Sequence, residues 1–198
     1  MVIGDVSRGI RTPRLPILIE TTLPPHSFPR GPAITYLTPL FAIVVGIVHA
    51  GLSPTIVIAD VSPNLVLVAV VLVTALRGFL PGITFAFVGG LTANLLVGAP
   101  LGSVPLAMLA VAVATAGGAR LMGRMTWIYP VLAAFVGSAV ADVVTLSLAQ
   151  LVAAAPPLVL PAGIVFAAAI LNAAIAGIIL SPARRLAGRY AGDEAAAW

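Results

Sequence analysis

The sequence predicts an all-α polytopic membrane protein with six transmembrane helices. Of its 198 residues, 61% are hydrophobic and only 8% are charged, and the mean hydropathy is +1.16. A soluble domain does not cover so much apolar surface with so few charges. Apolar runs close to the roughly 20 residues that a helix needs to cross a bilayer recur along the chain, separated by short segments rich in glycine and proline.

The chain divides into an N-terminal tail, a membrane domain and a C-terminal tail. Residues 1–32 contain six prolines and four arginines, and this proline density prevents a long helix. We therefore expect a largely disordered cytoplasmic tail; contact of its arginines with the membrane surface is a less favoured alternative. The six-span membrane domain covers 33–182, and 183–198 form a cytoplasmic tail. The expected spans are Ala33–Leu52, Pro63–Arg77, Phe79–Val97, Ser103–Leu121, Trp127–Ala153 and Leu158–Leu180.

The second expected span is short for a full crossing. Ser62 before Pro63 is typical of an N-cap followed by proline at the first helical position. From Pro63 to Arg77 a helix rises only about 22 Å at 1.5 Å per residue. Either this helix starts deeper in the membrane, or the apolar piece at 55–61 enters the membrane before it.

The charges predict the topology. All ten basic residues are arginine. With both termini in the cytoplasm, every arginine lies in an inner segment and none in an outer loop; the inner segments are 1–32, 77–78, 120–126 and 181–198. This asymmetry indicates six spans with both ends inside. The arginines stand singly or in short groups at helix ends rather than on a solvated basic face, which argues against nucleic-acid binding.

Small residues recur at four-residue spacing on most spans, which places them on one helix face where two backbones can approach closely. Most of these faces are expected to serve internal packing. The triplet of the first span, Ala42, Gly46 and Ala50, is the one we expect to face a partner protein.

Asp142 is the single acid within a span, near the middle of the fifth. An unpaired carboxylate there costs at least about 2.5 kcal/mol, so it must face the bundle interior, be protonated or be paired. Two interpretations stay open. One is a ligand or proton site; the other, which we favour, is a structural hydrogen bond to Asn94, Asn172, Ser138 or Thr145.

The sequence contains no recognisable set of catalytic or metal-binding residues. Without cysteine, disulfides and thiolate chemistry are excluded. His26 and His49 are the only histidines, and two histidines without nearby carboxylates do not make a metal site. There is no serine–histidine–acid set and no phosphate-binding loop with lysine. We therefore expect no catalytic, cofactor or metal site, and a protein that is not an enzyme.

The hairpin over residues 63–102 resembles the rod shape-determining protein MreD family. The resemblance is carried by Pro63-Asn64 before an apolar run, Leu76-Arg77-Gly78 at the bend, Gly90 and Asn94 in the third span, and the turn Gly98-Ala99-Pro100-Leu101-Gly102. Family members characteristically have aspartate where this chain has Asn64 and Asn94. These departures remove charge but keep a polar side chain, so a hydrogen-bonding role survives. The family motif residues are thus Pro63, Arg77, Gly78, Gly90, Pro100, Leu101 and Gly102.

The resemblance implies a non-enzymatic subunit of the bacterial cell-elongation machinery in the inner membrane, embedded in lipid. Such proteins work beside a single-span MreC-like protein, the MreB filament system and the synthases of lateral peptidoglycan. The family also looks like the six-helix S-components of energy-coupling factor transporters. A substrate-binding S-component for a vitamin or metabolite is therefore the alternative function, with Asp142, Asn94 and Asn172 as its pocket polar groups. The aromatic content of this chain, 6%, is low for a protein with such a pocket.

Overall fold

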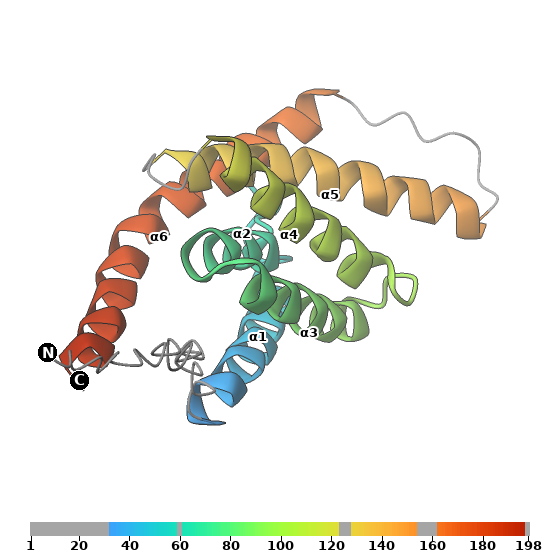
Figure 1. The fold of residues 1–198 in the computed structure, drawn as a ribbon. Helices are drawn as coiled ribbons and strands as arrows, with labels where there is room; N and C mark the ends of the chain where they lie inside the picture. The colour runs from blue at the N-terminus through green and yellow to red at the C-terminus, as the bar shows by residue number, and fades with distance from the viewer. Residues whose placement is uncertain (1–31, 59–60, 123–127, 154–161, 197–198) are drawn as a thin grey trace, which may run out of the picture. The chain divides into compact units, whose positions relative to one another are not determined.

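Helices make up nearly all of the described chain (Figure 1). The computed structural model describes residues 32–58, 61–122, 128–153 and 162–196, so the predicted N-terminal tail lies outside this part except for Pro32. Within it the only strand-like pairing is an isolated bridge between Ile58 and Val61. The prediction of an all-α chain with six helices is confirmed. The helices are α1 (Pro32–Leu52), α2 (Leu65–Arg77), α3 (Phe79–Val97), α4 (Ser103–Met122), α5 (Tyr129–Ala153) and α6 (Ala162–Ala196).

The chain is a membrane protein, and its described part contains four helices long and apolar enough to cross a bilayer. These are α3, α4, α5 and the part of α6 from Ala162 to Arg185. The apolar part of α1 (Leu37–Leu52) and α2 are shorter. Large apolar side chains on α1, such as Leu40, Phe41 and Ile47, are more than half exposed. Such side chains suit contact with lipid tails.

The short helix α2 lies at the centre of the helical domain. It contacts each of the other five helices, whereas α1 contacts only α2 and α3, and α6 only α2 and α5 (Figure 1). Val66, Val70 and Val71 of α2 are completely buried. The other helices follow each other around α2 in chain order, from α3 to α4, α5 and α6. The core is therefore built on the first arm of the hairpin that the sequence singles out.

The beginning of α2 differs from the prediction. The helix starts at Leu65, and its N-cap is Asn64, whose Oδ1 accepts a hydrogen bond of 3.0 Å from the Leu67 N–H. Ser62 is exposed and Pro63 is buried outside the helix. Asparagine and serine are about equally good N-caps, so the choice between them depends on tertiary contacts that the local sequence does not contain.

The end of α6 also differs. The predicted span ends at Leu180, but the helix continues through Pro182 as far as Ala196. The residues beyond Arg185 are rich in alanine, which has the highest helix propensity. A single proline costs about 3 kcal/mol within a helix, and the long helix on both sides of it outweighs that cost here.

The position of α2 explains its shortness. The Asn64 N–H donates a 2.8 Å hydrogen bond to Oδ1 of Asn172, which lies ten residues into α6. The same Asn172 side chain bonds to Ser138, nine residues into α5. At 1.5 Å per residue these positions are about 14 to 15 Å from the starts of their helices. The structure thus favours the first alternative, in which α2 starts deep within the bundle.

Candidate functional site

The motif hairpin bends sharply between α2 and α3. Gly78 has φ of 102°, a left-handed value that side chains rarely adopt, and its N–H donates to the Thr74 carbonyl. A Cβ on Gly82 would lie 3.0 Å from Thr74 Cα and would collide with the Thr74 side chain. Arg77 is exposed at the end of α2. The glycines therefore let α2 and α3 pack closely directly after the bend, while the charged side chain of Arg77 stays at the surface.

Gly90 lies where α3 and α4 approach each other closely. A Cβ on Gly90 would lie 2.8 Å from Pro105 Cα, 3.2 Å from Pro105 N and 3.3 Å from Met108 Cγ. Two of these atoms belong to backbone, which cannot move aside as a flexible side chain does. Gly90 thus has a packing role, as the spacing of small residues on this helix predicts.

Asn94 closes the turn between α3 and α4. Its Nδ2 donates to the Ala99 carbonyl (2.9 Å), and its Oδ1 accepts from the N–H groups of Gly102 (3.0 Å) and Val104 (3.3 Å). Asn94 is 1% exposed. One buried side chain therefore satisfies both the turn and the free N–H groups at the start of α4. An aspartate here could accept the same two N–H bonds but could not donate to the Ala99 carbonyl.

The other motif residues of this turn lie at the surface. Gly98 and Gly102 have positive φ values of 71° and 90°, which glycine adopts without strain. Leu101 is 82% exposed. Beside the turn is a hollow of about 180 Å³ lined by Pro100, Leu101, Gly102, Ser103, Leu106 and Leu148. Its one side-chain hydroxyl, on Ser103, donates to the Pro100 carbonyl, so the hollow offers little polar chemistry to a ligand.

Asn172 joins three helices in the interior. Besides accepting from the Asn64 N–H, it donates from Nδ2 to the Ser138 hydroxyl oxygen over 3.0 Å. Asn172 and Ser138 are each 2% exposed. The prediction did not include Asn64 in this cluster. An asparagine directly before an apolar run was the available signal, because this arrangement is typical of an N-cap.

Ala42 and Gly46 correct the prediction about the partner-facing triplet. Ala42 is completely buried, and a Cβ on Gly46 would lie 2.8 Å from Thr92 Cβ and 3.0 Å from the Gly89 carbonyl oxygen of α3. Ala50 is half-buried. This face of α1 is thus covered by α3 within the chain. Small residues suit close packing against any helix, so their spacing alone does not distinguish an internal neighbour from a partner.

Asp142 does not have the structural hydrogen bond that we favoured. It is half-buried on α5, and among the described residues no hydrogen bond or ion pair involves its side chain. Of the four expected partners, Asn94 bonds within its turn, and Asn172 and Ser138 bond to each other. Thr145 is exposed one turn further along α5. The buried polar residues of the prediction therefore form two separate clusters that exclude Asp142.

The described residues contain no group of three histidine, cysteine, aspartate or glutamate side chains that could hold a metal ion. His49 is half-buried on α1, and its Nδ1 atom is enclosed without a hydrogen-bond partner. The buried side chains of Thr74, Asn94, Ser103, Ser138 and Asn172 bond to backbone or to each other. Together, the glycine contacts and the buried hydrogen bonds hold the helices close to each other.

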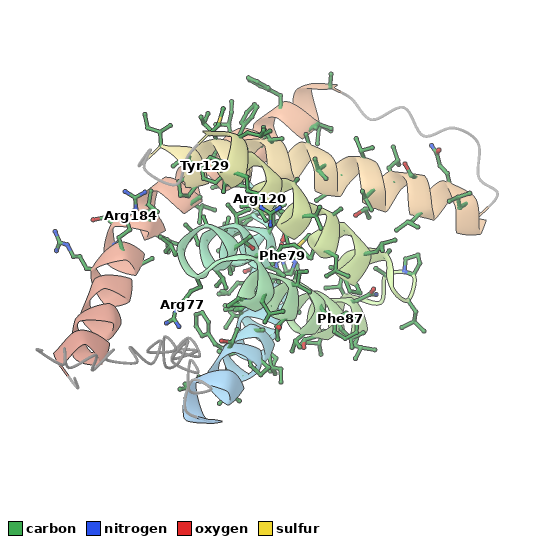
Figure 2. The ribbon with its side chains drawn as sticks, viewed as in Figure 1. Arg77, Phe79, Phe87, Arg120, Tyr129 and Arg184 are labelled. Atoms are coloured by element: carbon green, nitrogen blue, oxygen red, sulfur yellow. The ribbon has the colours of Figure 1, made fainter. Side chains whose placement is uncertain are left out.

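Figure 2 shows how the charged side chains lie relative to this packing. Arg77, Arg120 and Arg184 project from α2, α4 and α6. Consecutive helices from α2 onward run antiparallel, as indicated by the contacts of Gly82 with Thr74, Gly90 with Pro105, Gly118 with Tyr129, Gly137 with Val111, and Gly177 with Val131. These three helices therefore run in the same direction and carry their arginines near the same end of the domain.

Comparison of the chain with protein-family models, with curated proteins and with solved structures finds no match.

Proposed function

We propose that this chain is a non-enzymatic subunit of the bacterial cell-elongation machinery in the cytoplasmic membrane. It would act by docking an MreC-like single-span protein, beside the MreB filament system and the synthases of lateral peptidoglycan. The observation that carries the proposal is the place of the hairpin over residues 63–102 in the fold. Its first arm is the central helix of the domain, and Gly90 and Asn94 in its second arm fix the packing and the turn. The residues that carry the resemblance therefore hold the helices in fixed positions, as a docking protein requires.

The alternative, an S-component that carries a vitamin or metabolite, is less well supported. Two of its three expected pocket groups, Asn94 and Asn172, already bond to backbone and side chains within the chain. The small residues Ala42 and Gly46, which would contact a transporter partner, pack against α3. A ligand site of that kind needs several convergent free polar groups, and the described residues do not offer such a set.

The proposed topology has both termini in the cytoplasm. Asn64 and Asn172 are hydrogen-bonded at one level, and Arg77 and Arg185 each follow thirteen residues later on helices that run in the same direction. The two arginines thus lie at about the same depth, roughly 20 Å further along. Together with Arg120 they form one basic edge, which the positive-inside rule assigns to the cytoplasm.

Single cysteines should report this topology cleanly, because the natural chain has none. We expect Leu101→Cys to react with a membrane-impermeant maleimide in intact spheroplasts, and Leu121→Cys to react only after lysis. These side chains are 82% and 90% exposed; Leu101 lies just before the start of α4 and Leu121 in its last turn. Labelling of both cysteines in intact spheroplasts, or the opposite pattern, would contradict the topology.

Depletion in a rod-shaped bacterial host tests the cellular role. We expect depleted cells to become round and to lose lateral incorporation of a fluorescent cell-wall precursor, while septal incorporation continues. Re-expression of the wild-type chain should restore rods, and so should Gly117→Ala, whose added methyl group has nothing within 4 Å. Depleted cells that remain rods would refute the proposed function.

A further inference from the structure

Asp142 lies on the side of α5 that faces α6. Phe135 is two turns earlier on the same face, and its ring meets that of Phe166 of α6 edge-on, with centroids 5.7 Å apart. Ser138 is one turn earlier and bonds to Asn172 of α6. Residues three, four and seven apart share a helix face. The carboxylate therefore lies along the seam between α5 and α6, thirteen residues into a helix of 25.

Nothing in the described part of this seam neutralises the carboxylate. From Ala162 to Leu171 α6 contains only apolar residues, and Asn172 is already engaged. Arg185 follows Asn172 by thirteen residues, about 20 Å along the helix. Asp142 is only half-buried, so its carboxylate remains accessible from outside the domain.

A charge at this depth is costly, and acids within membrane helices pair with other groups or mark functional sites. Because the described residues supply no partner for the carboxylate, a group from outside the chain is the candidate. A second copy of the chain would bring another carboxylate and thus repulsion. A basic side chain on a membrane-spanning helix is itself costly without an acid, so the two charges complement each other.

We infer that the α5–α6 seam at Asp142 docks a membrane-spanning partner helix that carries an arginine or lysine at the matching depth. The inference rests on the proposed function in that a partner helix is docked, and it adds the chemistry by which that helix is recognised. The ion pair selects the partner's depth, and the apolar surroundings strengthen it by excluding water.

Binding of synthetic helices tests the inference with the full chain in phosphatidylcholine vesicles. The probes are labelled 23-residue leucine–alanine peptides with arginine at residue 12, with leucine at residue 12, or with arginine moved to residue 5. Energy transfer from a dye on Leu101→Cys reports binding. We expect the central-arginine peptide to bind about tenfold more tightly than the other two, the scale of a favourable interhelical polar contact.

Two variants at position 142 make the test specific. Asp142→Asn should reduce the preference to less than twofold, whereas Ser147→Ala on the exposed face of α5 should leave it unchanged. Asp142→Lys should reverse it, so that a peptide with glutamate at residue 12 binds best. Circular dichroism should confirm that each variant is folded, because Asp142 makes no bond within the described chain.

The inference is overturned if wild type shows no preference for central arginine, or if Asp142→Asn keeps it. These outcomes are separate from those of the depletion experiment. Round depleted cells without a peptide preference would leave the proposed function standing and remove this inference. A preference that depends on Asp142, in a chain whose loss leaves cells rod-shaped, would support the docking chemistry and remove only the cellular role.

Discussion

Replacing Gly90 with leucine is expected to lower the free energy of unfolding by about 3 kcal/mol or more, the upper range for overpacking a close contact. The added Cβ alone would lie 2.8 Å from Pro105 Cα and 3.3 Å from Met108 Cγ, and leucine adds three further carbon atoms to it. Because the obstacle is backbone, α3 and α4 must move apart. Such a movement would also strain the turn that Asn94 closes. Denaturation in detergent by sodium dodecyl sulfate, followed by circular dichroism, measures the change.

Gly117→Ala is the matched control for Gly90→Leu. Gly117 lies within α4, is exposed and has nothing within 4 Å of the position of an added Cβ. Alanine should therefore stabilise the chain by about 0.5–1 kcal/mol, because glycine is the poorer helix former. Equal stability of wild type and Gly90→Leu would show that α3 and α4 do not approach each other at this point.

Replacing Asn172 with leucine is expected to cost about 2–3 kcal/mol of unfolding free energy. The change removes two hydrogen bonds at once, from the Asn64 N–H and to the Ser138 hydroxyl. It leaves the N–H at the entry of the central helix without a partner, and an unsatisfied buried polar group costs about 1–3 kcal/mol. Leucine has the same branching at Cγ and is larger than asparagine, so the loss does not come from a cavity. The same denaturation experiment gives the value.

Two further variants separate the polar effect from packing. Ala174→Leu, two residues along the same helix at an exposed position, should change stability by no more than about 0.5 kcal/mol. Ser138→Ala removes only one of the two bonds and should cost about 1 kcal/mol. Combined with Asn172→Leu, it should add less than it costs alone, because the shared bond is already lost. Full additivity would mean that Ser138 and Asn172 do not interact.

The sequence by itself determined the class of the protein and the positions of its helices. Hydropathy and proline–glycine punctuation are local signals, so α3 is found at Phe79–Val97 as predicted, and α4 and α5 to within two residues at each end. The all-α architecture follows from the same cause, because an apolar segment in a bilayer must satisfy its backbone internally. Local signals did less well at the entry of α2, where Ser62 and Asn64 are equally good caps and only Asn64 is held by Asn172.

Only the tertiary structure decided which helix faces meet. In a membrane both the lipid-facing and the protein-facing sides of a helix are apolar, so periodicity does not separate them as it does in soluble proteins. The spacing of Ala42 and Gly46 therefore predicts a partner-facing surface, whereas this face packs against α3. For the same reason the bonds of Asn172 and Asn94, and the absence of any for Asp142 within the described chain, could not be read from spacing. Those contacts join residues up to 108 positions apart, and chain folding alone brings them together.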